Sequence, residues 1–240
     1  MQGIADAGGT PHCFPAIAIL DPADNRALLA VVDDLDRFDL AVFISANAVS
    51  KALNVVQARR GRLPDRLELL CIGRQSAQAL ARFGYPDSIA PAGRFDSESL
   101  LALPALAQPA GKRVVIFRGD GGRELLGNVL HERGAEVVYA ECYRRARPEG
   151  AVGPLLRLWA RNEIHAVTFT SVDGLRNLFD LLGKLGQQWL IRTPAIVLSP
   201  RIEAAARELG FKGRVEIAPE ASDEGLLMAL KAWRTGQKTL

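Results

Sequence analysis

The sequence contains an internal repeat with a constant offset of 126 residues. Three motifs that lie far apart in the chain recur at this offset: a strand that ends in serine, a helix that ends in glycine, and a helix that begins near glutamate. The matched positions are Ser45 with Ser171, Gly84 with Gly210, and Glu98 with Glu224. Unrelated motifs would not keep one spacing, so the sequence predicts two copies of one structural unit.

Each copy alternates short apolar runs with amphipathic segments. Leu40–Ile44 and Ala166–Thr170 have the length and composition of buried strands, and each precedes a segment of helical period. Buried strands that alternate with helices predict an α/β fold, in which a parallel sheet is covered on both faces. Two longer extended runs, His12–Ile19 and Tyr139–Arg145, also correspond at the repeat offset. They form either a paired two-strand linker between the copies or the last strand of each sheet.

The charge balance and the cysteine pattern exclude several classes of protein. The 30 basic and 27 acidic side chains give a formal net charge of +3, which is too balanced for a protein that coats nucleic acid. The three cysteines lack metal-ligand spacing, and their odd number favours reduced thiols. No apolar run is long enough to span a bilayer, and residues 1–15 lack a signal-peptide pattern. We therefore expect a cytoplasmic protein that contacts neither nucleic acid nor membrane.

Polar and cationic side chains collect where the predicted strands end. Open parallel sheets bind ligands at these carboxyl ends, where the following helices also present unpaired N–H groups. Hydroxyl, guanidinium and N–H groups together suit a polyanionic ligand. The candidate substrate-binding residues are Ser45, Asn47, Gly73, Arg74, Ser76, Arg118, Gly119, Thr170, Ser171, Ser199 and Arg201. Each hydroxyl or amide alone also fits an ordinary helix cap, and each arginine alone also fits a surface position.

The glycine-rich turn in the middle of the chain allows another interpretation. Gly119, Gly121 and Glu124 follow the spacing of the dinucleotide-binding fingerprint. The last of these positions requires glycine or alanine for close packing of a helix on a strand, and Glu124 breaks that requirement. A nucleotide-binding α/β protein is therefore a hypothesis that rests on an imperfect pattern.

Five motifs stand in the order and spacing of a known family. They are Phe43–Val49, Cys71–Ala77, Ile116–Gly119, Cys142–Arg145 and Thr168–Ser171. Over essentially its whole length the chain resembles the uroporphyrinogen-III synthases. The resemblance implies two flavodoxin-like, doubly wound parallel-sheet domains joined by a two-stranded linker. It places the first domain at residues 1–13 and 149–240, the second at 22–138, and the linker strands at 14–21 and 139–148.

The same resemblance implies a reaction. The family cyclises linear hydroxymethylbilane, a polycarboxylate, to uroporphyrinogen III in tetrapyrrole and haem biosynthesis, without a cofactor or a metal. The terminal hydroxyl leaves as water, and the last pyrrole ring is inverted through a spiro intermediate. Tyr143 matches the family's tyrosine on the linker strand, where it is either the general acid for the departing hydroxyl or a structural residue of the hinge. We expect a monomeric enzyme of the hydro-lyase type.

The chain departs from the family at three places. Ile44 replaces the usual threonine before Ser45, and Ile202 stands where a second hydroxyl is expected after Ser199. The opening strand of the first domain is missing, because the repeat offset takes the counterpart of Val114–Phe117 to negative positions. This strand is internal in flavodoxin-like order, so we expect a chain extended upstream to be markedly more stable. These losses favour a non-catalytic anion- or tetrapyrrole-binding module as the alternative function.

Overall fold

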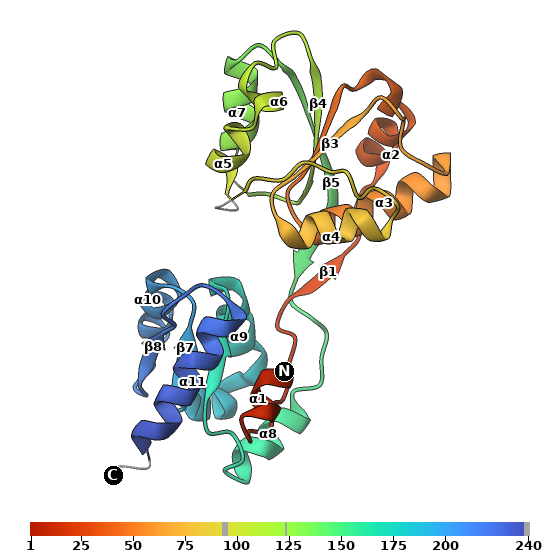
Figure 1. Ribbon diagram of the computed structural model, residues 1–240. Helices are drawn as coiled ribbons and strands as arrows, with labels where there is room; N and C mark the ends of the chain where they lie inside the picture. Colours follow the sequence, from red (N-terminus) through yellow and green to blue (C-terminus); the bar gives the residue numbers. More distant parts are fainter. Residues whose placement is uncertain (93–95, 123, 238–240) are drawn as a thin grey trace. The chain divides into compact units, whose positions relative to one another are not determined.

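The computed structural model describes residues 1–92, 96–122 and 124–237. The chain divides into two compact units. Unit 1 combines Met1–Ala18 with Arg147–Leu240, and unit 2 is Ile19–Ala146 (Figure 1). The two ends of the chain meet in unit 1, where Arg234 donates a hydrogen bond to the Ala7 carbonyl at 2.9 Å. The finer division, with separate linker strands at 14–21 and 139–148, stays a prediction.

Unit 2 is built on a five-stranded sheet with the order β1-β5-β4-β2-β3. Its strands are β1 (Ala18–Leu20), β2 (Leu40–Phe43), β3 (Glu68–Cys71), β4 (Arg113–Gly119) and β5 (Glu136–Ala146). Strand β2 pairs in parallel with β3 and β4, and β4 pairs in parallel with β5. The carboxyl ends of these four strands therefore point toward the same edge of the sheet.

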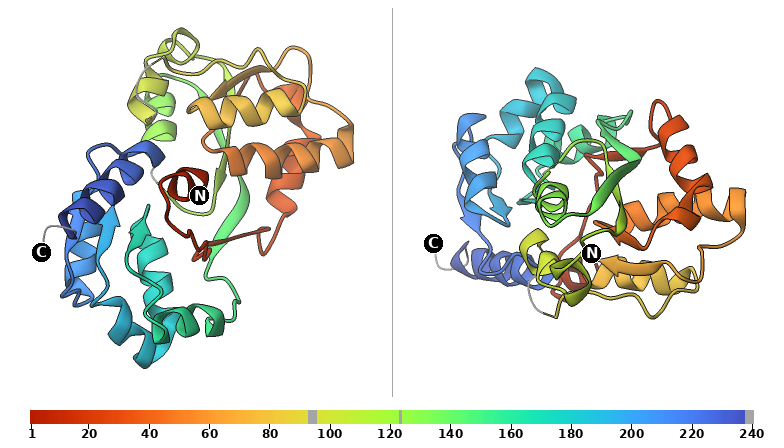
Figure 2. Two further views of the ribbon diagram at one scale, coloured as in Figure 1. Left: turned by 60° about the horizontal axis from the view of Figure 1, so that its bottom comes forward. Right: turned by 90° about the horizontal axis from the view of Figure 1, so that it is seen from above.

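Helices cover both faces of this sheet. They are α2 (Arg26–Asp33), α3 (Ala46–Arg60), α4 (Arg74–Arg82), α5 (Ser97–Leu101), α6 (Pro104–Ala107) and α7 (Leu125–Glu132), with a 3-10 turn, η1, at Leu35–Arg37. Figure 1 and Figure 2 show α3 and α4 side by side on one face and α5 and α7 on the other. Residues of β2 alternate between the two layers: Ala41 and Phe43 face the core on the α3 side, whereas Leu40 and Val42 face the core on the α7 side. A strand buried on both faces has to be apolar throughout, as this one is.

Unit 1 contains a three-stranded parallel sheet with the order β6-β7-β8. Its elements are α1 (Gln2–Asp6), α8 (Gly153–Ala160), β6 (Val167–Phe169), α9 (Val172–Leu190), β7 (Ala195–Val197), α10 (Pro200–Glu208), β8 (Val215–Ile217) and α11 (Asp223–Gln237). Ala195 and Val197 pack with residues of α8, α9 and α10, whereas Ile196 packs with residues of α11. This sheet is therefore also covered on both faces. In the part of the chain that the structure describes, no helix is both long and apolar enough to cross a membrane.

Matching local geometry confirms the repeat. Ser45 Oγ and Ser171 Oγ each accept the backbone N–H three residues further on, both at 3.0 Å. Gly84 and Gly210 each follow a helix with a positive φ, 94° and 87°. The register between β2 and β3 is that between β6 and β7 shifted by the repeat offset. The prediction of two related α/β units with parallel pairing is therefore confirmed.

Two parts of unit 1 differ from the sequence pattern. The extended run predicted at His12–Ile19 enters a strand only at Ala18, where β1 begins. The sequence pattern predicts a loop at Pro148–Gly153 and no helix after it, whereas helix α8 begins at Gly153. Proline is nevertheless tolerated in the first turn of a helix, where its missing N–H has no partner anyway, and Trp159 of α8 is buried in the core.

Candidate active site

Tyr143 lies at the carboxyl ends of β2 and β4, within unit 2. Its phenolic oxygen is 3.2 Å from Ser45 Oγ, and the residue is only 2% exposed. Ser45 also caps α3, since its Oγ accepts an N–H of the first turn. The structure thus joins the predicted catalytic residue to a predicted substrate-binding residue, although the two are 98 positions apart in the sequence.

Gly119 makes room for this tyrosine. Gly119 and Tyr143 face each other across β4 and β5. A Cβ atom at position 119 would lie 2.6 Å from two ring carbons of Tyr143, and such a distance is a steric overlap. The close approach of the ring therefore requires glycine at this position.

A β-bulge directs Tyr143 inward. Arg118 pairs with Glu141 and Gly119 pairs with Tyr143, so β5 carries one extra residue, Cys142, opposite β4. Cys142 and Tyr143 consequently both pack in the core on the α3 side, although neighbours in a regular strand point to opposite faces. Burial raises the pKa of the Cys142 thiol to about 12. This thiol is uncharged at neutral pH, which argues against a nucleophilic role.

Arg118 is the next-to-last residue of β4, beside the glycine-rich turn. Its guanidinium carbon is 4.6 Å from the centre of the Tyr139 ring, and its Nε lies 3.9 Å from the Glu141 carboxylate. The same Nε donates a hydrogen bond to the Gly119 carbonyl at 3.2 Å. The side chain is 6% exposed, and its Nη2 faces the turn, since a Cβ at Gly122 would lie 3.7 Å from that atom. An anion seated in the turn would meet a guanidinium whose position is already fixed.

The other predicted residues of unit 2 surround the starts of α3 and α4. Asn47 and Arg74 are exposed in the first turns of these helices, whereas Gly73 and Ser76 are buried. Gly73 also accepts a weak hydrogen bond from Cys71 Sγ at 3.8 Å. Because β2 and β3 are neighbours, both helix starts lie at the carboxyl edge of the sheet. Asn47 and Arg74 are the two of these residues that a ligand can reach.

The predicted residues of unit 1 lie at the carboxyl ends of β6 and β7. Ser171 caps α9, and the exposed Thr170 precedes it. Ser199 stands at the N-cap position of α10 but makes no capping hydrogen bond, and Arg201 is exposed in the first turn. Ile202 is 3% exposed and belongs to the core, so the hydroxyl expected there is replaced by a packing residue. Of these predicted residues, Thr170 and Arg201 are the exposed ones.

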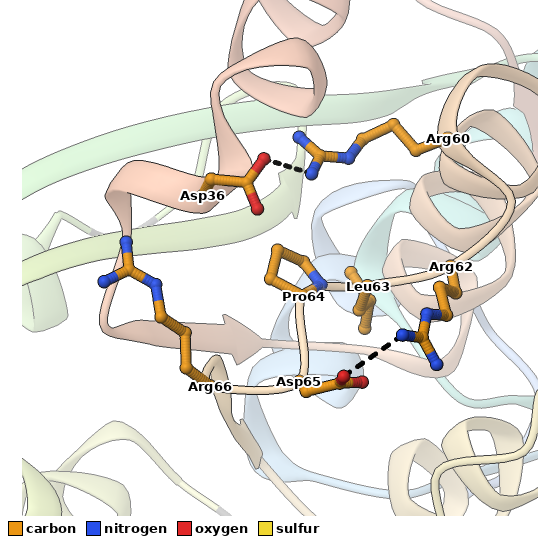
Figure 3. A pocket seen from close by; sticks show the side chains of 7 residues that line it. All are labelled: Asp36, Arg60, Arg62, Leu63, Pro64, Asp65 and Arg66. Carbon is orange, nitrogen blue, oxygen red and sulfur yellow. Dashed lines mark hydrogen bonds and ion pairs between the residues drawn. The ribbon is translucent and has the colours of Figure 1, made fainter.

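Figure 3 shows a pocket of about 450 Å³ next to the amino end of β3. It is lined by Asp36, Arg60, Arg62, Leu63, Pro64, Asp65 and Arg66. Arg60 forms an ion pair with Asp36, and Arg62 forms one with Asp65 at 3.1 Å. Two of the arginines that line the pocket are therefore neutralised by carboxylates. Parallel sheets bind ligands at the other edge, so this pocket is not the candidate active site.

Sequence-based selection misses two arginines that follow Tyr143 in β5. The Arg145 guanidinium carbon is 5.8 Å from the centre of the Tyr143 ring, and the Arg145 N–H donates to Asp120 at 3.1 Å. Arg144 Nε is enclosed and has no hydrogen-bond partner among the described residues. A buried guanidinium nitrogen without a partner is uncommon in proteins, and this one directly follows the candidate catalytic residue in the sequence. The motif Cys142–Arg145 contains this signal, but the sequence does not show which of its arginines lacks a partner.

The fold and the site define a class: a two-unit α/β protein with phenol, hydroxyl and guanidinium groups at the carboxyl ends of its strands. Within the described ranges, no group of three or more His, Cys, Asp or Glu side chains is placed to hold a metal. Residues 2–228 match the family model described as uroporphyrinogen-III synthase HemD. The chain therefore belongs to the uroporphyrinogen-III synthase family, as the sequence motifs predict.

Individual relatives agree with this assignment. The chain is 35% identical to the uroporphyrinogen-III synthase of Escherichia coli (strain K12) over 219 residues, which are 91% of this chain and 89% of the relative. It is 35% identical to that of Salmonella typhimurium (strain LT2) over 225 residues, 93% of this chain and 91% of the relative. Its fold resembles that of uroporphyrinogen-III synthetase from Helicobacter pylori 26695, with a TM-score of 0.61 at 14% identity and 91% of each chain covered.

Proposed function

We propose that the chain is a uroporphyrinogen-III synthase, a hydro-lyase that cyclises hydroxymethylbilane to uroporphyrinogen III in tetrapyrrole biosynthesis. The observation that carries this function is the identity of 35% to a curated synthase over 91% of the chain. The hydroxyl pair of Tyr143 and Ser45 supports it, since the reaction begins with the loss of a hydroxyl group.

Tyr143 is the proposed general acid of the first step. Its O–H bond supplies the proton, the carbon–oxygen bond of the substrate breaks, and the hydroxyl departs as water. The phenol is buried and Ser45 is only partly buried, so Ser45 is the hydroxyl that a ligand meets first. We propose that Ser45 passes the proton from Tyr143 to the leaving group across their 3.2 Å contact. The alternative role of Tyr143, a structural residue, predicts no effect of its hydroxyl on turnover.

The remaining candidate residues are proposed to hold the carboxylates of the substrate. In unit 2 these are the exposed Asn47 and Arg74 and the guanidinium of Arg118 beside its glycine-rich turn. In unit 1 they are the residues at the starts of α9 and α10, namely Thr170, Ser171, Ser199 and Arg201. Helix N-termini and arginines stabilise bound anions. Fixed donors also position a flexible linear substrate and stabilise the charge that develops when the hydroxyl leaves.

Isomer analysis tests the proposed function. The protein is incubated with freshly prepared hydroxymethylbilane, the products are oxidised, and uroporphyrins I and III are separated. Type III above the level without protein supports the synthase. Type I alone, together with tight binding of the porphyrinogen, supports the alternative of a non-catalytic tetrapyrrole-binding module. The substitution of a hydroxyl by the buried Ile202 is the observation that favours this alternative.

Three further features belong to the same proposal. The two linker strands are residues 14–21 and 139–148. This part of the proposal is supported by the pairing of β1 with β5, since both strands reach the boundary between the two units. The protein works as a monomer in the cytoplasm. The free thiols of Cys13, Cys71 and Cys142 fit a reducing compartment.

A further inference from the structure

Arg118 is the one charged residue, among those that the structure describes, that is buried. A buried charge is costly unless neighbouring groups stabilise it. The Glu141 carboxylate contributes little, because it lies 3.9 Å from Arg118 Nε and its side chain is half exposed, so that solvent screens the pair. The Gly119 carbonyl accepts one hydrogen bond from the same nitrogen. The guanidinium therefore needs a further partner.

The ring of Tyr139 is this partner. Its centre lies 4.6 Å from the guanidinium carbon, which is a cation–π distance, and such contacts are stronger where water is excluded. Ile116 pairs with Tyr139 and Arg118 pairs with Glu141, so Tyr139 and Arg118 are diagonal neighbours on one face of the sheet. This is the face that α7 covers. The ring therefore lies beside the guanidinium and under a helix.

Helix α7 leaves space for this ring at Gly127. A Cβ atom at position 127 would overlap the Tyr139 hydroxyl oxygen and would lie 2.7 Å from the ring carbon that carries it. A larger residue would therefore displace the phenol. The Tyr139 hydroxyl also donates a hydrogen bond to the Glu124 carbonyl at 3.4 Å, just before α7 begins. Glycine inside a helix is less stable than alanine, so the space at Gly127 serves the placement of Tyr139 at the expense of local stability.

The two outer nitrogens of Arg118 keep their capacity for hydrogen bonds. The polar contacts of its side chain with described residues both involve Nε, and no described residue accepts a hydrogen bond from Nη1 or Nη2. Two N–H groups of one guanidinium match a carboxylate in bidentate geometry. Fixing a flexible arginine side chain costs conformational entropy. A ring that holds the guanidinium beforehand removes this cost from the binding of the carboxylate.

We propose that Tyr139 is a positioning residue, which holds the Arg118 guanidinium in place for a carboxylate of the substrate. The inference rests on the proposed function, in which Arg118 binds a carboxylate of hydroxymethylbilane. Tyr139 acts through Arg118, and its ring is the part of the side chain that matters. It lies outside the five motifs that identify the family, so the sequence pattern does not select it.

Steady-state kinetics of Tyr139→Leu and Tyr139→Phe test the role of the ring. We expect Tyr139→Leu to raise KM about tenfold and to leave kcat within about threefold, because a misplaced guanidinium weakens the binding of the substrate. A merely destabilised protein would have a smaller active fraction, which lowers kcat at an unchanged KM. Tyr139→Phe keeps the ring and should keep the parental KM. In the Arg118→Ala background, Tyr139→Leu should leave KM unchanged.

Hydrogen exchange of the Arg118 Nε–H, followed by NMR of isotope-labelled protein, reports the guanidinium without any turnover. The Arg118→Ala spectrum identifies the signal by its absence. We expect slow exchange in the parent chain, because Nε donates to a carbonyl in a buried position. Exchange in Tyr139→Leu should be faster by about tenfold or more. If Tyr139→Leu does not fold, Gly127→Ala supplies the same test, since its Cβ displaces the phenol.

Tyr85→Leu is the matched control. Tyr85 is also partly buried, but its hydroxyl accepts the Leu63 N–H at 2.9 Å. This variant removes a tyrosine ring elsewhere in unit 2. It should therefore leave KM and the exchange of the Arg118 Nε–H at their parental values.

Three outcomes would overturn the proposal. The first is a parental exchange rate of the Arg118 Nε–H in Tyr139→Leu. The second is an equal rise of KM on Tyr139→Leu in the parent and in the Arg118→Ala background, which would show that the ring does not act through Arg118. The third is a KM of Tyr139→Phe as high as that of Tyr139→Leu. A parent chain that forms no type III isomer would instead refute the synthase function, and the exchange rate would then decide whether Tyr139 holds Arg118.

Discussion

Replacing Gly119 by alanine is expected to destabilise unit 2 and to disturb the candidate active site. The added Cβ would lie 2.6 Å from two ring carbons of Tyr143 and 3.0 Å from its hydroxyl oxygen. Neither partner moves easily, since Gly119 lies in an internal strand and Tyr143 is 2% exposed. Overpacking of this kind costs about 1–3 kcal/mol. Displacement of the Tyr143 hydroxyl from Ser45 adds about 0.5–1.5 kcal/mol.

The assay combines denaturant unfolding with turnover of hydroxymethylbilane. Gly150→Ala is the matched control, because a Cβ there has no neighbour within 4 Å and its φ is not positive. We expect Gly119→Ala to lower the unfolding midpoint and the rate, and Gly150→Ala to change neither. A double-mutant cycle isolates the cause. Leucine at position 143 lacks the outer ring atoms that the new Cβ meets, so Gly119→Ala should cost less in Tyr143→Leu than in the parent chain. An equal cost in both backgrounds would refute the steric argument.

The remaining predictions concern Tyr143, Arg118 and Cys142. Tyr143→Phe keeps the ring but removes the hydroxyl. Turnover should therefore fall without being abolished, because the hydroxyl of this class of substrate also leaves spontaneously, whereas a parental rate would make the tyrosine structural. Arg118→Ala should weaken transition-state stabilisation by about 1.5–3 kcal/mol, measured as kcat/KM, for the loss of a hydrogen bond to a carboxylate. The exposed Arg66→Ala is its control, and equal kinetics of the two variants would remove Arg118 from the site. Burial raises the pKa of the Cys142 thiol to about 12 in the folded protein, whereas the pKa of a cysteine in an unfolded chain is about 8.5. Between these two pH values, the thiol therefore loses its proton in the unfolded state but keeps it in the folded state. The free energy of unfolding should therefore decline with rising pH in that window, by up to about 1.4 kcal/mol per pH unit. Cys142→Ala should remove this part of the decline. Identical slopes of the unfolding free energy against pH in both proteins would contradict the raised pKa of Cys142.

The internal repeat and the local signals of the sequence were sufficient to predict the architecture. Ser45 and Ser171 cap helices and Gly84 ends one through contacts within a few residues, and such contacts can be inferred from a pattern. The alternation of apolar runs with helices similarly fixes the layers. Helix α8 escapes prediction because its burial depends on a partner far along the chain: Trp159 donates its indole N–H to Thr193 at 3.0 Å.

The candidate site is less accessible to sequence reasoning. The contact between Tyr143 and Ser45 depends on a bulge at Cys142, and no local pattern shows that β5 carries one residue more than β4. The need for glycine at position 119 likewise arises from a ring on another strand. The sequence could therefore name the residues at strand ends, whereas the distances among them required the structure. The substrate-binding roles of these residues stay predictions.

The initial rate of uroporphyrinogen III formation, measured at several concentrations of the protein, tests the proposed synthase activity. Spontaneous cyclisation proceeds without ring inversion and gives the type I isomer, so the type III isomer reports the enzyme alone. We predict that the type III rate rises in proportion to protein concentration and that type I declines as the substrate is diverted. A type III rate that stays at the background level at every concentration, while type I forms as it does without protein, would contradict the proposed function.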